Sequence, residues 1–497
     1  MSESNNFFDY INKKPQVSYP DVGIKNEPYL KKVHVQTWGC QMNVADTERM
    51  LSLLGTCNYR QTQDVEDADF ILLNTCHIRE KARHKLVSRL GELKPLKESK
   101  PQLILAVSGC VAQAEAKSLA KELPYVDMIF GPDQIEDLPN LLEEVVRKNE
   151  SEKKMLEDYN TKNSPYIVTQ FDAKEVGYSI PIDVVPPYYD ESKNEVTRFV
   201  NIIKGCNNFC TFCVVPYTRG REKSRAEKEI LDEVKFLVDK GVKEIILLGQ
   251  NVNSYGLDLI GAADIHSSQG QLPFSDLLYK VSDVPGVERI RFTTSNPHDF
   301  TPNLAKAFEE LPKVTNSFHL AVQSGSDKIL DRMNRQYTRA EYFERVKWIR
   351  DVRPEIAFST DIIVGFPGET DEDFEDTLSL VQEMQYAFIY AFKYSIRKGT
   401  PAVRFKEQVP EDVKDRRLQI LLDLQKKETL RQNLLEIGKV RQVLILYKNK
   451  KEENTWYGRT YEGRLVKVSG SHNSIGLILP VKITGANLTA LEGSILS

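Results

Sequence analysis

Residues 199–213 read FVNIIKGCNNFCTFC, an apolar run followed at once by three cysteines with the spacing C-x3-C-x2-C. We call Cys206, Cys210 and Cys213 the loop cysteines. A 4Fe–4S cluster normally takes four cysteine ligands, so three on one loop would leave one iron open to a small molecule. The alternative is a structural zinc site with three cysteines and a histidine, although no histidine lies near this loop.

Length and composition indicate a multidomain protein. At 497 residues the chain predicts about three domains. Its apolar runs are far shorter than the ~20 residues of a membrane span, and no secretory leader is visible at the N-terminus, so we expect a cytoplasmic location. Seven cysteines, an odd number, favour metal binding or redox chemistry over a disulfide framework.

Charge is unevenly distributed along the chain. The net charge of −4 does not by itself indicate a nucleic-acid partner. Residues 437–497, however, carry nine Lys or Arg against four Asp or Glu. A small basic domain of this kind suits contact with a phosphate backbone, and a merely solvated basic surface is the alternative.

Three further cysteines each follow a predicted strand. The strands Val33–Trp38, Phe70–Asn74 and Leu103–Val107 end shortly before Cys40, Cys76 and Cys110, which we call the strand-end cysteines. Helical stretches separate the strands and predict an open parallel α/β sheet over residues 31–150. Because parallel strands end at one edge of a sheet, the three cysteines are expected to share a metal site. Cys57 lies outside this pattern and is expected to be an apolar filler or a surface thiol.

A second βα series is predicted over residues 195–436, after a polar arm at 1–30 and a linker at 151–194. Its expected strands are Phe199–Ile203, Glu244–Leu248, Arg289–Thr293, Ser317–Val322, Ala357–Val364 and Ala387–Tyr394. Six such units, where a full (βα)8 barrel has eight, favour a partial (βα)6 barrel with the loop cysteines at the end of its first strand. Short alternating strands at 437–497 predict a small antiparallel β-barrel.

These features together resemble a known family. The loop cysteines, with an aromatic residue before the last of them, resemble the radical S-adenosylmethionine signature. Three separate upstream cysteines, this loop and a basic C-terminal barrel of the TRAM type resemble the methylthiotransferases, from Lys31 to the end of the chain. The motifs GCQMN at 39–43, NTCHIREKA at 74–82 and CVVPYTRG at 213–220 resemble the MiaB-type branch that acts on tRNA.

The resemblance implies two 4Fe–4S clusters, one on each set of three cysteines, and two molecules of S-adenosylmethionine per turnover. The loop cysteines would hold the cluster that generates a 5′-deoxyadenosyl radical, and this radical would abstract hydrogen from C2 of N6-isopentenyladenosine on the 3′ side of the anticodon. The strand-end cysteines would hold the auxiliary cluster that supplies the sulfur. Implied partners are tRNA, an electron donor such as flavodoxin or ferredoxin, and a sulfur-supplying iron–sulfur carrier.

The resemblance also implies contacts by position. Those to S-adenosylmethionine would come from Phe212, Gly249, Gln250, Asn251, Gln323, Ser324 and Gly365, although turn chemistry alone explains several of these residues. A cluster of basic residues is expected to touch tRNA phosphate or to form a solvated face: Arg219, Arg221, Lys223 and Arg225.

Rival functions differ in substrate or in class. One is methylthiolation of a ribosomal protein or of threonylcarbamoyl-adenosine in tRNA, which uses the same six cysteines. The other is a non-catalytic iron–sulfur or zinc protein that binds RNA, which predicts two metal centres but no cleavage of S-adenosylmethionine.

Overall fold

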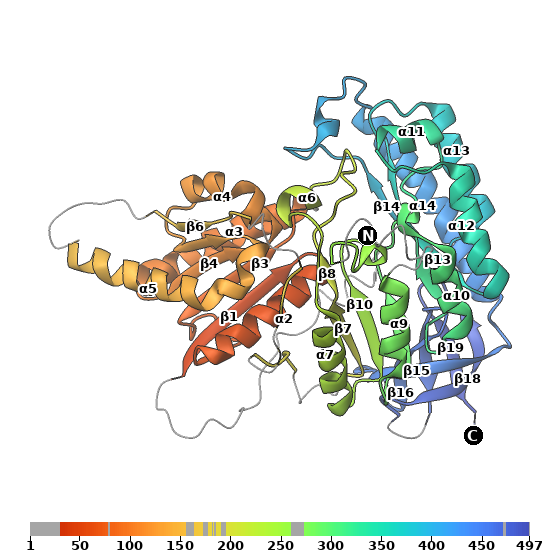
Figure 1. Ribbon diagram of the computed structural model, residues 1–497, viewed down its shortest axis with the longest axis horizontal. Helices are drawn as coiled ribbons and strands as arrows, with labels where there is room; N and C mark the ends of the chain where they lie inside the picture. Colours follow the sequence, from red (N-terminus) through yellow and green to blue (C-terminus); the bar gives the residue numbers. More distant parts are fainter. Residues whose placement is uncertain are drawn as a thin grey trace. The chain divides into compact units, whose positions relative to one another are not determined.

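The computed structural model describes residues 30–77, 80–155, 164–171, 177–180, 182, 185–189, 195–259, 273–470 and 474–496. The chain forms two compact units, one of Met1–Lys193 with Val214–Arg221 and one of Asn194–Cys213 with Glu222–Ser497 (Figure 1). The predicted arm before residue 30 and much of the predicted linker lie outside the described residues.

The first unit contains a sheet of six strands in the order β2-β1-β3-β4-β5-β6, and every neighbouring pair is parallel. Its strands are β1 (Lys31–Trp38), β2 (Tyr59–Gln61), β3 (Phe70–Thr75), β4 (Ile104–Ser108), β5 (Met128–Phe130) and β6 (Tyr166–Val168). Strand β6 falls inside the predicted linker, for which no strand was predicted. The parallel α/β sheet predicted for this region is confirmed.

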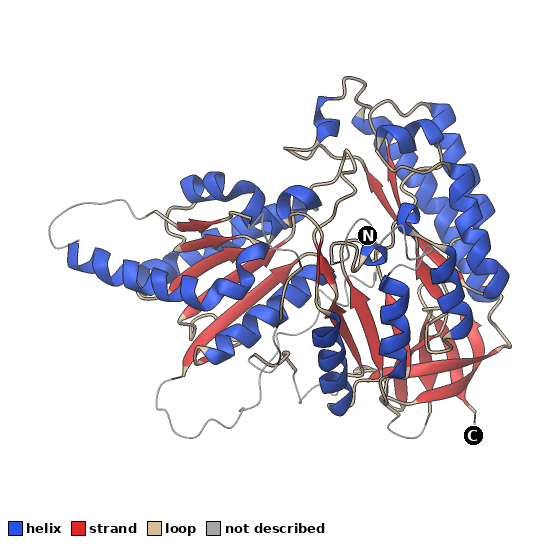
Figure 2. Cartoon of the chain, viewed as in Figure 1, coloured by secondary structure: helices blue, strands red, loops and turns tan. Residues whose placement is uncertain are grey.

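Helices cover both faces of this sheet (Figure 2). They are α2 (Gln41–Thr56), α3 (Glu80–Ser99), α4 (Cys110–Glu122), η1 (Pro132–Asp137) and α5 (Leu138–Met155). Apolar residues of α2 and α5 pack with one side of the strands, and those of α3 and α4 with the other. Strand β3 is therefore buried along its whole length, as its continuous apolar run requires. Cys57 packs at the margin of the first of these cores.

The second unit begins with a partial barrel. Parallel strands β7 (Thr197–Asn201), β10 (Glu244–Leu248) and β11 (Arg289–Phe292) form one sheet, and β12 (Ser317–His319), β13 (Ala357–Val364) and β14 (Phe388–Lys393) form another. Isolated parallel bridges, including Ser295 to Leu320, connect β11 to the segment around β12. The six predicted strands are thus present in the predicted order.

Helices alternate with these strands. They are α7 (Glu227–Asp239), α9 (Pro273–Asp283), α10 (Pro302–Glu310), α11 (Asp327–Arg332), α12 (Arg339–Val352), α13 (Asp371–Met384) and α14 (Glu411–Leu434), with the short turns η3 (Val252–Ser254), η4 (Pro297–Asp299) and η5 (Pro401–Arg404). The predicted first strand, Phe199–Ile203, is divided. Strand β7 ends at Asn201, and β8 (Ile203–Lys204) pairs in the antiparallel sense with β9 (Lys223–Ser224).

The chain ends in a closed five-stranded barrel in the order β15-β16-β17-β19-β18. Its strands are β15 (Val440–Lys448), β16 (Thr455–Thr460), β17 (Leu465–Ser469), β18 (Ile478–Ala486) and β19 (Leu491–Ile495). The predicted barrel is confirmed, but it is not wholly antiparallel, because β17 and β19 are parallel. A closed ring with an odd number of strands must contain at least one parallel pair.

The barrel and the partial barrel belong to the same unit and are joined by a buried side chain. Arg289 of β11 donates hydrogen bonds to the carbonyl oxygens of Arg459 (2.8 Å) and Thr460 (2.7 Å) on β16. None of the helices in the described part of the chain is long and apolar enough to cross a membrane.

Candidate metal centres

The strand-end cysteines follow three strands that are neighbours in the first sheet. The register pairs Trp38 of β1 with Thr75 of β3, and Asn74 of β3 with Ser108 of β4. Cys40 caps α2, and Cys110 is the first residue of α4. The expectation that the three strand ends meet at one edge of the sheet is therefore confirmed.

Two glycines allow these strand ends to approach. A Cβ atom on Gly39 would lie 2.7 Å from the Cβ of Cys76, a contact that real side chains do not make. Gly109 has a φ of +93°, and a Cβ there would lie 2.4 Å from the carbonyl oxygen of Thr75. Only a residue without a side chain fits both positions.

A buried network of amides holds this edge in place. Asn43 Nδ2 donates to Asn74 Oδ1 (3.1 Å), and Asn74 Nδ2 donates to the Asn43 carbonyl oxygen (2.8 Å) and to Thr47 Oγ1 (2.9 Å). The Cys40 amide and thiol both donate to Asn43 Oδ1 at 3.4 Å. Because the amides connect α2 to β3, they fix Cys40 relative to the strand that precedes Cys76.

The surroundings favour a thiolate at Cys40. Its hydrogen bond with Cys76 is the largest cause that lowers its pKa to about 6, and the charge of Arg219 acts in the same direction against burial. Burial raises the pKa of Cys110, although Arg219 opposes this through its charge and a hydrogen bond. Arg219 itself is buried and binds both carboxylate oxygens of Asp46, at 3.3 and 2.5 Å.

The polar groups at this edge suit an iron–sulfur cluster. Thr75 Oγ1 and Ser108 Oγ, one or two residues before a cysteine, are buried and have no hydrogen-bond partner among the described residues. Such hydroxyls can donate to cluster sulfur atoms. In the described chain no three His, Cys, Asp or Glu side chains, the strand-end cysteines and the loop cysteines included, lie together as a metal site, so a shared centre at either set of cysteines stays a prediction.

The loop cysteines lie in the second unit, after β7 and β8. The end of α11 holds their loop: Thr211 donates its amide to the Met333 carbonyl oxygen (3.1 Å) and its hydroxyl to that of Arg332 (2.8 Å). Asn334 Nδ2 donates to the carbonyl oxygens of Asn208 and Phe209, both at 3.2 Å. Residues more than a hundred positions away thus set the shape of the loop.

A buried arginine contacts one of the loop cysteines as well. Arg335 Nη1 lies 3.2 Å from Cys210 Sγ, and Nη2 donates to Asn296 Oδ1 (3.1 Å) and to the Ala321 carbonyl oxygen (2.7 Å). Burial raises the pKa of Cys206 to about 12. The fixed cation beside Cys210 favours an anionic group at this loop. Sequence reasoning missed Arg335, because nothing in its local sequence indicates this contact.

Several residues predicted to bind S-adenosylmethionine lie at or near this loop. Gln250 Oε1 accepts from the amide of Gly205 at 2.5 Å. The ring of Phe212 packs edge-on against Phe366, with centroids 6.4 Å apart. Gly249 is required by close packing, since a Cβ there would lie 2.3 Å from the side chain of Ile203.

The other predicted cofactor contacts have partners within the chain. Asn251 is buried and donates to Asp299 at 2.5 Å. Ser324 Oγ lies 3.4 Å from Thr377 Oγ1. Gln323 and Gly365 both have left-handed backbones, with φ values of +74° and +69°. Their contact with S-adenosylmethionine stays a prediction.

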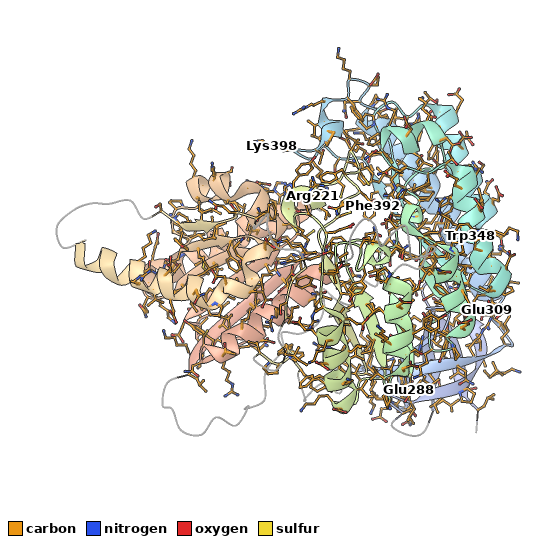
Figure 3. All side chains as sticks on the ribbon, viewed as in Figure 1. Arg221, Glu288, Glu309, Trp348, Phe392 and Lys398 are labelled. Atoms are coloured by element: carbon orange, nitrogen blue, oxygen red, sulfur yellow. The ribbon has the colours of Figure 1, made fainter. Side chains whose placement is uncertain are left out.

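The four basic residues expected to form an exposed cluster do not do so. Arg219, Lys223 and Arg225 are buried, and Arg225 forms ion pairs with Glu229 and Glu233 of α7. This corrects the expectation of an exposed cluster, since burial keeps these side chains from phosphate groups in the folded chain. Arg221 is exposed (Figure 3), and its contact with tRNA stays a prediction.

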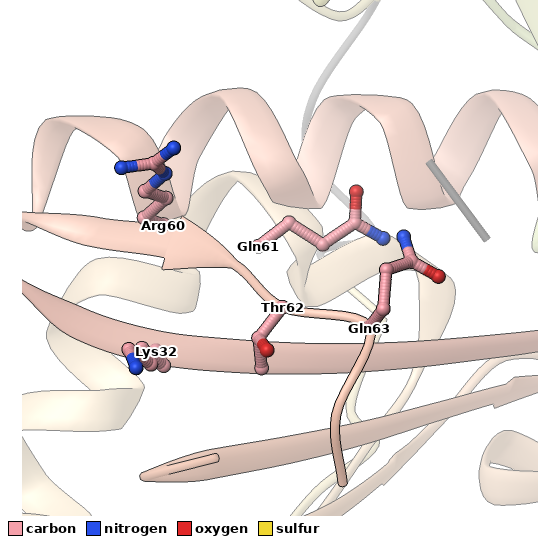
Figure 4. A pocket seen from close by; sticks show the side chains of 5 residues that line it. All are labelled: Lys32, Arg60, Gln61, Thr62 and Gln63. Carbon is pink, nitrogen blue, oxygen red and sulfur yellow. The ribbon is translucent and has the colours of Figure 1, made fainter. Parts of the chain in front are cut away.

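A cavity of about 290 Å³ lies elsewhere in the first unit (Figure 4). It is lined by Lys32, Arg60, Gln61, Thr62 and Gln63. Lys32 is near the start of β1, whereas Cys40 follows its end, so this cavity is at the opposite end of the sheet from the strand-end cysteines.

Comparisons with known proteins agree with this arrangement. Family models match at residues 200–381 (Radical SAM superfamily), 32–131 (Uncharacterized protein family UPF0004) and 434–496 (TRAM domain). The chain is 44% identical over 461 residues to a tRNA-2-methylthio-N(6)-dimethylallyladenosine synthase of Clostridium botulinum, covering 92% of this chain and 96% of that protein. It is 41% identical to a protein of the same name from Carboxydothermus hydrogenoformans, covering 93% and 99%.

A solved structure shares the fold at low identity. The radical S-adenosylmethionine methyltransferase TsrM from Kitasatospora setae, with cobalamin and a [4Fe-4S] cluster bound, matches with a TM-score of 0.52 and 13% identity. The match covers 76% of this chain and 77% of that chain.

Proposed function

Since the chain belongs to the family of tRNA-2-methylthio-N(6)-dimethylallyladenosine synthases, we propose that it methylthiolates C2 of N6-isopentenyladenosine beside the anticodon of tRNA. The observation that carries this proposal is the pairing of near full-length similarity with two separate three-cysteine sites. Each site is supported by a buried arginine and is formed where strands of an α/β sheet end.

The strand-end cysteines and the loop cysteines would each hold a 4Fe–4S cluster. Bound there, the clusters would supply the electron that cleaves S-adenosylmethionine and the sulfur that reaches the product. The chain's own residues orient these sites. Asn43 and Asn74 fix the edge of the first sheet, and Arg335 fixes Cys210 against the end of the partial barrel.

The remaining elements would bind the cofactor and the RNA. Gln250, which accepts from the Gly205 amide, and Phe212, which packs on Phe366, would contact S-adenosylmethionine. The basic barrel of β15–β19 would contact the phosphate backbone of tRNA. We place the reaction in the cytoplasm, with a flavodoxin or ferredoxin as electron donor and an iron–sulfur carrier that replaces the consumed sulfur.

Two measurements test the proposal. Anaerobic incubation of the reconstituted protein with dithionite and S-adenosylmethionine should release 5′-deoxyadenosine. Its absence would favour a non-catalytic RNA-binding protein. Mass analysis of tRNA nucleosides from cells without the gene should show N6-isopentenyladenosine without its 2-methylthio form. Persistence of the modified nucleoside, together with loss of methylthiolation from a ribosomal protein, would favour the rival substrate.

A further inference from the structure

The ion pair of Arg219 and Asp46 is a charged element beside the strand-end cysteines, and the proposed function leaves open what the pair does to a cluster bound there. The side chains of Arg219 and Asp46 are only 5% and 9% exposed. Both terminal nitrogens of the guanidinium donate to the carboxylate. Asp46 lies on α2, and Arg219 follows the short helix α6 (Val215–Thr218), which packs against α4. Two buried charges are costly to place, so their position at a cysteine site calls for a reason.

The pair faces the cysteines unequally. Arg219 acts through its charge to lower the pKa of both Cys40 and Cys110, whereas Asp46 acts through its charge to raise that of Cys110. The cation therefore acts on two of the three strand-end cysteines. In a buried site with little solvent screening, both charges act strongly on any further charge that the thiolates acquire.

The loop cysteines have a different electrostatic arrangement. Arg335 also contacts a cysteine, but its hydrogen-bond partners are Asn296, Tyr337 and the carbonyl oxygen of Ala321. Among the described residues it hydrogen-bonds to no carboxylate. Arg219 is thus paired with a carboxylate, whereas Arg335 is not, because the carboxylate at the loop cysteines, Glu222, accepts hydrogen bonds from Asn207.

We propose that Arg219 and Asp46 together set the reduction potential of the cluster that the strand-end cysteines hold, with Arg219 raising it and Asp46 lowering it. Reduction adds one negative charge to a cluster, which a buried cation stabilises and a buried carboxylate opposes. The inference rests on the proposed function, since it requires a cluster at these cysteines. Arg219 is a positioning and electrostatic residue in this role, because it acts on the cluster through the cysteines.

The test uses the full chain with the loop cysteines replaced by alanine, so that one cluster is present. Potentials are measured by redox titration followed by electron paramagnetic resonance after anaerobic reconstitution. We expect Asp46→Asn to raise the potential and Arg219→Gln to lower it, each shifting the reduction equilibrium about tenfold, or ~59 mV for one electron. The matched control is Asp67→Asn, which removes the exposed ion pair with Lys32 at the opposite end of the sheet and should leave the potential unchanged.

The essential result is that the two variants shift the reduction potential in opposite directions. If the ion pair had only a structural role, both variants would shift the potential in the same direction or would lose iron to the same extent. Equal or same-sign shifts overturn the inference. If Arg219→Gln fails to bind iron, Arg219→Lys is measured in its place. Because lysine keeps the positive charge, the potential of this variant must differ less from the parent than the potential of Asp46→Asn does. Failure of the parent itself to bind iron and sulfide would refute the proposed cluster, whereas unchanged potentials in loaded variants refute only this inference.

Discussion

Replacing Arg289 by methionine should detach or destabilise the C-terminal barrel. The guanidinium is fully buried, lies 3.3 Å from Glu244 Oε1, and stacks over the ring of Tyr461 with the cation 4.7 Å from its centroid. Its two hydrogen bonds to β16 are charge-assisted, a class in which each contributes about 1.5–3 kcal/mol. Arg291 remains 3.7 Å from Glu244 and compensates part of the loss. We therefore expect a cost of about 3–4 kcal/mol, at the lower end of the range for a broken buried ion pair.

The barrel contains its own fluorescent probe for this experiment. Of the three tryptophans, only Trp456 lies in the barrel, where it is buried, so Trp38→Phe and Trp348→Phe make the signal specific. With a urea dependence of about 2 kcal/mol/M, Arg289→Met should lower the midpoint of the Trp456 transition by about 1.5–2 M.

Two companion variants show whether the buried charge pair is the cause. Glu288→Gln removes the half-exposed pair with Lys243 on the same strand end (Figure 3) and should cost less than about 1 kcal/mol. Adding Glu244→Gln to Arg289→Met should restore part of the stability, because it removes the carboxylate that the single variant leaves buried. A midpoint within ~0.5 M of the parent for Arg289→Met, or an equal shift for Glu288→Gln, would refute this reasoning.

Three further outcomes follow from the described contacts. Replacing either the loop cysteines or the strand-end cysteines by alanine should halve the iron content, and only the strand-end variant should still release 5′-deoxyadenosine, as iron assays and chromatography can measure. Burial acts to raise the pKa of Asp373, but hydrogen bonds from Lys328 and Thr370 lower it to about 2. The ionised carboxylate therefore stabilises the folded protein above pH ~4, and this stabilisation is lost as the pH falls towards 2. Without bound clusters, Asp373→Asn should lower the free energy of unfolding by about 1–2 kcal/mol at pH 7. The difference from the parent should vanish when unfolding is measured in acid. Arg221→Gln should reduce the slope of log affinity for tRNA against log salt by about 0.7–0.9, and an unchanged slope would exclude this phosphate contact.

The parts of the fold that local pattern determines were predictable from the sequence. Strands β10 and β13 have the predicted bounds, because one is a continuous apolar run and the other alternates buried and half-buried residues. Helix α13 begins where Thr370 and Asp373 form a capping box. The position of the strand-end cysteines at one edge of the sheet was predictable for a related reason, since parallel topology alone brings strand ends to one edge.

The positions of the charged residues were not predictable in the same way, because their partners are distant in the sequence. Arg219 and Arg225 belong to a short basic run that resembles a phosphate-binding surface, yet Arg219 pairs with a carboxylate 173 positions away. Arg335 lies 125 positions from the cysteine it contacts. A run of basic residues in the sequence shows only that charges are present. Whether each charge is buried depends on whether the fold supplies a counter-charge beside it. The cysteines therefore mark the two predicted centres in the sequence, whereas the buried arginines beside them, Arg219 and Arg335, become visible only in three dimensions.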